Sequence, residues 1–163
     1  MAGSTARTIG EPIEVKRAPE TGYQAQFSGP FAFAAGLIGG GGLGTGLDDY
    51  TDALAQDPGR RALMAKVDVV ADDECNAIYP FQFPAVVTVT TTAGDVLVEK
   101  VLTNRGGPAR PLSDDELTTK FRDNVAGRLD DDAADAVRRA ALGLRRATDV
   151  TTLLSPLNKE FRA

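Results

Sequence analysis

The chain has 163 residues, of which 42% are hydrophobic and 25% are charged, a composition typical of one globular domain. Its formal net charge of −5 argues against a duplex-binding surface, because binding to phosphates requires clustered cations. The sequence contains no histidine, which excludes a Ser-His-Asp triad, a Cys-His pair and a His-bound metal within this chain. Cys75 is the single cysteine, so we expect no internal disulfide and a reducing, cytoplasmic environment.

The N-terminal segment is expected to be a flexible leader, because residues 1–14 are rich in small and polar residues and show no hydrophobic period. The sequence has no apolar run typical of a signal peptide or a membrane span, which also favours a cytoplasmic protein. Ser28 as N-cap and Pro30 in the first turn predict a short buried helix. Its apolar residues at helical spacing are Phe31, Ala34, Ala35 and Ile38. The glycine-rich run 39–46 ends this helix and predicts a mobile loop.

The middle of the chain alternates between helical and extended patterns. One or two helical turns are expected over residues 48–55, and Asp57-Pro58 predicts the start of another helix. Residues 66–70 alternate apolar and polar, which predicts a strand that runs into an acidic loop at 71–74. Residues 84–90 and 96–102 are rich in β-branched side chains and flank Ala93-Gly94, which predicts an antiparallel hairpin.

The C-terminal third is predicted to be helical. Ser113 and Glu116 form a capping-box pattern at the start of a helix, whose apolar stripe is expected to be buried. That stripe consists of Leu117, Phe121, Val125 and Leu129. A second helix is expected from about residue 130 to 146, with an alanine-rich face suited to close packing, and an apolar segment follows it. We therefore predict an α+β fold, a small sheet containing antiparallel strands with flanking helices.

Three local features are compatible with ligands, and each has a simpler interpretation. The glycine run resembles a phosphate loop but lacks its Gly-Lys-Ser/Thr ending, so a hinge or loop is favoured. The acidic run 72–74 lacks the spaced ligands of a calcium loop, so a solvated turn is favoured over a divalent metal site. Arg105 and Arg110 lie in a glycine- and proline-rich loop, where guanidinium groups can bind a carboxylate bidentately or remain surface residues.

Three stretches carry a resemblance to a known family. They are QAQFSGPFAFAA at residues 24–35, VVTVTTTAG at 86–94 and RGGPARPLSDDELTTKF at 105–121. In this order they resemble the C-terminal part of the MmgE/PrpD family, which includes 2-methylcitrate dehydratase, cis-aconitate decarboxylase and iminodisuccinate epimerase. The resemblance extends over about residues 15–157, so we expect a single domain there and a tail at 158–163.

The resemblance implies a lid domain that closes over a substrate, together with helices that return to a large helical domain. The family's acid/base groups lie in sequence that this chain does not contain, so the resemblance implies no catalytic residue, cofactor or metal here. Phe31 stands where the family has an active-site tyrosine, which puts dehydration chemistry in doubt. Gln26, Ser28 and Phe31 are the residues expected to approach the cleft, with Arg105 and Arg110 as candidate carboxylate ligands. A helix cap with a buried first turn is the alternative interpretation of the first group.

Two functions remain open from the sequence. The first is the lid subunit, or C-terminal half, of a split MmgE/PrpD-type lyase for a small polycarboxylate, completed by a separate helical chain. The second is a non-catalytic assembly or regulatory module that retains the lid fold. Either function predicts a helical partner subunit or a homodimer, and neither involves nucleic acid or a membrane. A truncated fragment is a third alternative.

Overall fold

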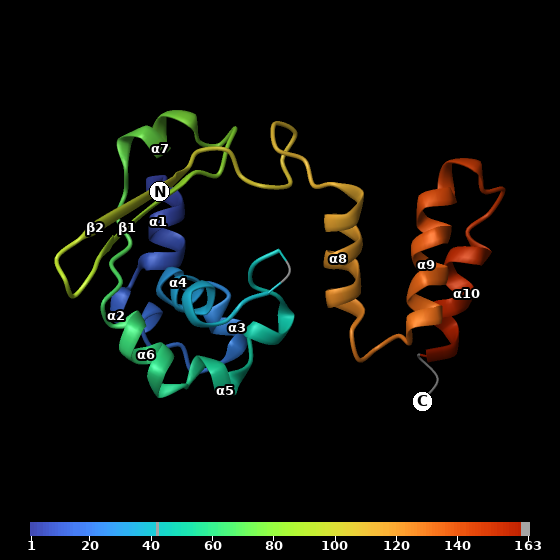
Figure 1. Cartoon of the computed structure of the whole chain (residues 1–163), viewed down its shortest axis with the longest axis horizontal. Coiled ribbons are helices and arrows are strands. Elements are labelled where there is room, and N and C mark those ends of the chain that lie inside the picture. The colour runs from blue at the N-terminus through green and yellow to red at the C-terminus, as the bar shows by residue number, and fades with distance from the viewer. Residues whose placement is uncertain (42, 161–163) are drawn as a thin grey trace. The chain divides into compact units, whose positions relative to one another are not determined.

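The computed structural model describes residues 1–41 and 43–160, with side chains described up to residue 157. Internal contacts divide the chain into two compact units, Met1–Ser113 and Asp114–Ala163, which differs from the single domain expected over residues 15–157. The first unit consists of helices and one antiparallel hairpin that lies at its edge, and the second unit is helical (Figure 1). This composition of elements confirms the predicted α+β class.

The first unit begins with short helices and ends with the hairpin. Its elements are α1 (Gly3–Gly10), α2 (Ile13–Lys16), α3 (Gly22–Ala25), α4 (Gly29–Ile38), a 3-10 turn at Leu47–Asp49, α5 (Asp52–Ala55), α6 (Pro58–Met64), α7 (Asp73–Ile78), β1 (Ala85–Thr90) and β2 (Val96–Val101). The second unit contains α8 (Asp114–Val125), α9 (Asp131–Gly143), a 3-10 turn at Leu144–Arg146 and α10 (Thr151–Glu160). Residues 158–160 of the predicted tail thus belong to α10, and 161–163 lie outside the described residues.

Helix α4 supplies half of the core cluster of the first unit. Ser28 caps it as predicted, accepting a hydrogen bond from the Phe31 backbone N–H at 3.0 Å. The fully buried core side chains are Ala25, Phe31, Ala34, Ala35, Ala55 and Met64. Ile38, which was expected on the same face, is exposed because it lies at the last turn, where the chain turns into the glycine loop. Four of the six core residues are alanines, so the helices approach closely and bury little area per residue.

The prediction of a flexible leader is wrong, because residues 3–10 form α1 and pack against distant segments. The Gly3 N–H donates to Asn76 Oδ1 at 2.7 Å, and the N-terminal ammonium donates to the Val70 carbonyl at 3.3 Å. Gly10 lies so close to Val69 that an added Cβ would come within 2.7 Å of that side chain. The contacts of α1 use small residues and backbone atoms, which produce no hydrophobic period in the sequence.

The strand predicted over residues 66–70 is also wrong, because this extended segment has no strand beside it among the described residues. Arg17 takes the place of a partner strand. Its Nε and Nη2 donate to the Val67 carbonyl at 3.1 and 2.9 Å, and Nη2 also forms a 2.6 Å ion pair with Asp68. The acidic run that follows starts a helix instead of forming a loop, since Asp72 caps α7.

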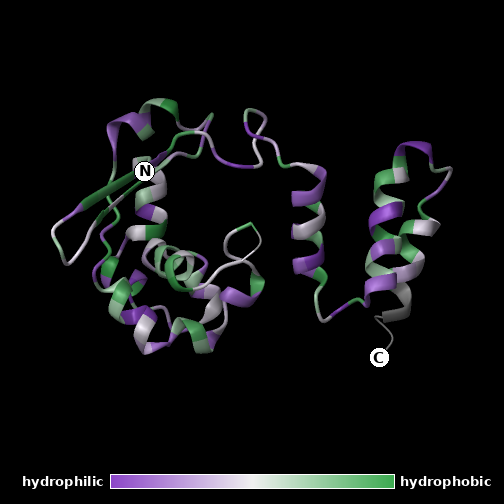
Figure 2. Ribbon diagram, viewed as in Figure 1, coloured by the Kyte–Doolittle hydropathy of each residue, from purple (hydrophilic) through white to green (hydrophobic). Residues whose placement is uncertain are grey.

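The predicted hairpin is confirmed. Strands β1 and β2 pair antiparallel, with Ala85 opposite Val101 at one end and Thr90 opposite Val96 at the turn. The turn is closed by the Thr91 N–H, which donates to the Asp95 carbonyl at 2.9 Å, and Gly94 provides the positive φ of 92° that it requires. Hydrophobic residues follow one another along both strands (Figure 2).

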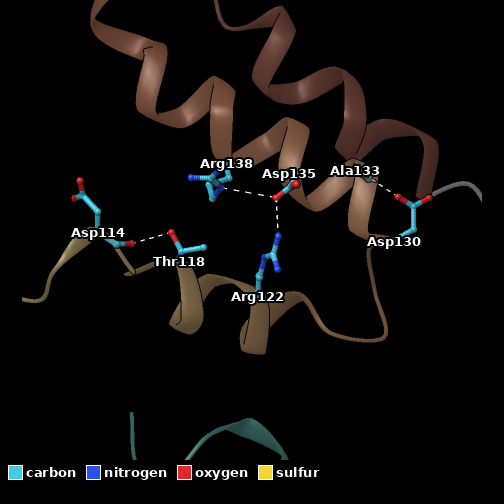
Figure 3. Close-up of polar contacts among 7 residues, drawn as sticks. All are labelled: Asp114, Thr118, Arg122, Asp130, Ala133, Asp135 and Arg138. Atoms are coloured by element: carbon cyan, nitrogen blue, oxygen red, sulfur yellow. Dashed lines mark hydrogen bonds and ion pairs between the residues drawn. The ribbon is translucent and has the colours of Figure 1, made fainter. Parts of the chain in front are cut away.

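The second unit is held together by a carboxylate between two arginines. Asp135 of α9 forms a 2.9 Å ion pair with Arg122 of α8 and lies 3.8 Å from Arg138, as Figure 3 shows. Helix α9 starts where it was predicted, and Asp130 caps it by accepting from the Ala133 N–H at 2.7 Å. The expected burial of the α8 stripe is wrong within this unit, because no described residue of α8 is buried. Leu117 is exposed, and Phe121, Val125 and Leu129 are half-buried, because α9 packs more extensively against α10 than against α8.

We expect Gly22→Ala to destabilise the first unit by about 2 kcal/mol or more, because its Cβ would lie 2.0 Å from the Tyr50 carbonyl oxygen. Gly36→Ala is the matched control. Gly36 lies within α4 with no atom within 4 Å of an added Cβ, so this variant should be about 0.5–1 kcal/mol more stable. Urea unfolding of both variants measures the difference, and a Gly22→Ala protein as stable as the parent would contradict the close approach of α3 to Tyr50.

Candidate functional site

Ser28 lies at the junction of α2 and α4 and is only 2% exposed. Its hydroxyl donates to the Lys16 carbonyl and accepts from the Phe31 backbone N–H at 3.0 Å. A hydroxyl has a single proton to donate, so the Lys16 bond leaves none for a substrate. These contacts favour the alternative interpretation of Ser28, as a helix cap, over a role in substrate binding.

Phe31 is fully buried in the core and therefore faces other side chains, not a cleft. Its ring centroid lies 5.4 Å from that of Tyr50, with the two rings tilted by 43°. The resemblance placed Phe31 at a position where the family has a tyrosine, and the surroundings of Phe31 here are apolar and aromatic. The ring therefore contributes packing in this structure.

Gln26 is the exposed member of the predicted group and directly follows α3. Two aromatic side chains that the sequence analysis did not single out flank it. Tyr23 and Phe27 form an edge-to-face pair with centroids 5.4 Å apart, and both are exposed. Their spacing of four residues was a usable signal, because residues i and i+4 share one side of a helical turn. The accessible surface near α4 thus combines an amide, a phenol and a phenyl ring.

Arg105 and Arg110 are both exposed and lie in one tight turn. The Gly106 N–H donates to the Arg110 carbonyl at 2.8 Å, and the Arg110 N–H donates to the Gly107 carbonyl at 3.0 Å. Gly106 has a φ of 90°, a conformation that side chains disfavour. These bonds fix the backbone between the two arginines, so both guanidinium groups project from one ordered turn.

The acidic run at the start of α7 is used in capping and ion pairing. Asp72 Oδ1 accepts from the Cys75 N–H at 2.9 Å, and this bond holds the pKa of Asp72 below its ordinary value. Glu74 pairs with Lys100 of β2 at 2.7 Å, which raises the pKa of that lysine. Burial raises the pKa of the Cys75 thiol, so this cysteine is a packing residue and a poor nucleophile. Within the described ranges, no cluster of three or more His, Cys, Asp or Glu residues could hold a metal ion.

The glycine loop directs its amides at a carboxylate of the chain itself. Asp49 accepts from the N–H groups of Gly40 and Gly46 at 3.3 and 2.8 Å. These are the kind of donors that a bound phosphate would need, so the contacts favour the loop interpretation. Residue 42 lies outside the described residues, and the mobility of the loop stays a prediction.

A shallow groove of about 600 Å³ lies between α1 and residues 69–71. Its polar lining includes Arg7, Glu11 and Asn76, and none of the predicted site residues borders it. The groove is open to solvent, so it does not provide the enclosure typical of small-molecule sites.

The described elements define an α+β domain whose perturbed ionisable groups act in caps, ion pairs and packing. The family model of the MmgE/PrpD C-terminal domain matches residues 2–145. The chain therefore belongs to the MmgE/PrpD family, as its three characteristic stretches predicted. The match begins at residue 2, so α1 belongs to the domain.

A search of curated proteins found no match. Among the described helices, none is long and apolar enough to cross a membrane.

We expect Ser28→Ala to lower the free energy of unfolding by about 1–2 kcal/mol, because it removes the α4 cap and leaves the part-buried Lys16 carbonyl without its donor. Thr51→Ala is the matched control, since Thr51 caps the four-residue α5 from an exposed position and should cost about 0.5 kcal/mol. Urea denaturation gives both values. An unchanged midpoint for Ser28→Ala would refute the structural role.

We expect Asp72→Asn to destabilise the protein at neutral pH but not in acid. The pKa of Asp72 is lower in the folded chain than its ordinary value of 3.8, so its carboxylate contributes stability that is present above that value. This contribution is lost as the pH falls through the folded pKa. Unfolding measured from neutral pH to about pH 2 should show the two proteins converging, whereas Thr51→Ala, which removes no titrating group, should differ from the parent by a constant amount.

Proposed function

We propose that this chain is the lid component of an MmgE/PrpD-type lyase for a small polycarboxylate, and that a separate helical chain completes the enzyme. The observation that carries this proposal is the exposure of large apolar side chains in the second unit. Five large aliphatic side chains there are between 42% and 69% exposed. They are Leu117, Leu142, Leu144, Val150 and Leu154. We infer that these side chains contribute to a surface that binds another protein, because contiguous apolar patches commonly mark such sites.

The docking surface differs in part from the alanine-rich face that the sequence suggested. Val137 of that face is already buried within the unit, as is the neighbouring Ala134, and α9 packs against α10. Leu142 and Leu144 follow at the C-terminal end of α9 and remain exposed. The proposed partner surface is therefore leucine-rich, which gains more free energy on burial than alanine does.

The chemistry of the chain supports a dependent role. It has no histidine, so under this proposal the partner supplies the proton-transfer groups. Arg105 and Arg110 remain accessible on one ordered turn. A guanidinium is suited to binding a carboxylate through two parallel hydrogen bonds, so these arginines are the proposed contribution of the lid to substrate binding.

The second candidate is a non-catalytic assembly or regulatory module with the lid fold. Two observations favour it: Phe31 is a buried core residue, and the Ser28 hydroxyl is engaged by the Lys16 carbonyl. Neither side chain is accessible to a substrate in this structure. Both candidates require a docking partner, and they differ in whether the assembled complex has lyase activity.

We expect the chain to form a stoichiometric complex when it is co-expressed with a histidine-containing helical MmgE/PrpD protein. Leu142→Asp and Leu154→Asp should each weaken this complex at least tenfold without unfolding the chain, because both residues are exposed in the free protein. Leu47→Asp is the control, since Leu47 is equally exposed in the first unit and should leave binding unchanged.

Light scattering after size exclusion measures complex formation, and assays on small di- and tricarboxylates measure lyase activity. A chain that ignores the helical protein overturns the lyase proposal and favours the non-catalytic module, with a homodimer as its assembly. A stable complex without activity, in which the helical protein carries its acid/base residues, favours the non-catalytic module.

A further inference from the structure

Arg60 of α6 has a half-buried guanidinium group without a counter-ion. Its Nε is buried and has no hydrogen-bond partner, and among the described residues its side chain forms no ion pair. Arg138 has the one other such nitrogen in the described part of the chain, but it lies 3.8 Å from an Asp135 oxygen. Buried polar groups are nearly always hydrogen-bonded, so an exception indicates strain or a group that binds there.

The carboxylates around Arg60 are bound to backbone groups instead. Asp57 caps α6 and accepts from the backbone N–H of Arg60 itself at 2.7 Å. Asp49 accepts from the N–H groups of Gly40 and Gly46 at 3.3 and 2.8 Å. A half-buried charge without a partner costs free energy. A water molecule would satisfy Nε but would leave this charge uncompensated, so an anion is the favoured occupant.

Gly39 leaves room for the guanidinium beside the glycine loop. A Cβ at Gly39 would lie 2.9 Å from Nη2 of Arg60 and 3.2 Å from Oδ1 of Asp49. The absence of a side chain at this residue therefore lets both groups approach the backbone. Nε and Nη2 lie on one edge of a guanidinium, and Arg17 uses the same edge to bind the Val67 carbonyl. Such an edge presents two parallel N–H groups, which suit two oxygens of one anion.

We propose that Arg60 binds a small oxyanion, a carboxylate or a phosphate, through its Nε and Nη2 beside Gly39. Both ligand groups have two oxygens at the spacing that a guanidinium edge binds. Gly39 and Gly40 are exposed, so an anion reaches this point from solvent. The ligand supplies the negative charge that Asp49 and Asp57 do not provide to the guanidinium.

Asp49 limits the affinity of this site. Its Oδ1 and the Nη2 of Arg60 border the same point beside Gly39, so its carboxylate repels a bound anion over a few ångström. Asp49→Asn removes the charge and keeps Oδ1 as an acceptor for the Gly40 N–H. We therefore expect this variant to bind the anion about tenfold more tightly than the parent. An affinity that is unchanged or lower would contradict the position of the site.

The direct test is an NMR titration of the full chain with sodium phosphate and, separately, with sodium succinate. Sodium chloride at equal ionic strength is the reference. We expect the Nε–H signal of Arg60 to shift and to saturate with a Kd of about 1 mM, since one guanidinium edge carries the contact. The Nε–H of Arg17 already donates to the Val67 carbonyl and should not shift. The tighter of the two ligands identifies the class of oxyanion. No shift of Arg60, or an equal shift with chloride, which indicates an adventitious ion only, overturns the proposal.

Arg60→Lys tests the guanidinium edge. This variant keeps the positive charge and removes the two parallel N–H groups, so we expect roughly fivefold weaker binding or less. Arg7→Lys is the matched control, because it makes the same change at an exposed arginine of α1 and should bind like the parent. Calorimetric titration measures both affinities. Equal binding by Arg60→Lys and the parent overturns the proposal.

Gly39→Ala tests the same site with Arg60 in place, and it applies even if Arg60→Lys fails to fold. Its Cβ would displace Nη2, the flexible end of the arginine, so we expect roughly fivefold weaker binding with unchanged circular dichroism. Gly41→Ala is the control in the same loop, because no atom lies within 4 Å of its added Cβ. Binding by Gly39→Ala that equals that of Gly41→Ala overturns the proposal. Arg105→Lys and Arg110→Lys should bind like the parent, which separates this site from the substrate contacts of the proposed lyase.

Discussion

The first unit depends on one buried hydroxyl. Ser28 donates to the Lys16 carbonyl of α2 and accepts from the Phe31 N–H of α4, so a single side chain fixes both the start of α4 and the position of α2 beside it. Helix α4 supplies half of the core cluster, Phe31, Ala34 and Ala35, and that core contains few large side chains. A small core gives a small net free energy of unfolding. Close contacts such as that of Gly22 with the Tyr50 carbonyl therefore matter as much as hydrophobic area.

The elements that the sequence predicted well are those whose determinants are local. The α4 cap at Ser28, the α9 cap at Asp130 and the hairpin turn at Gly94 each depend on a few neighbouring residues. The predictions that failed depend on contacts between distant residues. Residues 66–70 alternate like a strand, but the Val67 carbonyl accepts from Arg17 and the Val70 carbonyl accepts from the N-terminal ammonium, both far away in the sequence. The N-terminal helix is fixed by Asn76 and Val69, and no local pattern reveals these partners.

The candidate site shows the same limit. Ser28 and Phe31 belong to the motif that predicted a substrate site. The same residues are also typical of a helix cap and a core residue, and their burial favours this structural role. Arg105 and Arg110 were weaker candidates because loop arginines are common. The structure places both on one hydrogen-bonded turn and leaves them accessible. Of the five residues, the arginines and Gln26 are thus the ones that a ligand can reach.

The edge of β2 and the exposed leucines of the second unit differ in chemistry, so they suit different kinds of partner. The edge of β2 offers backbone donors and acceptors in a line, and such groups are satisfied by another strand in one register. The leucines of the second unit offer side-chain area without unsatisfied backbone groups, and this area is satisfied by any complementary apolar helix surface. Partner specificity at the leucines must therefore come from shape and from the surrounding charges, whereas at the hairpin the register itself provides it.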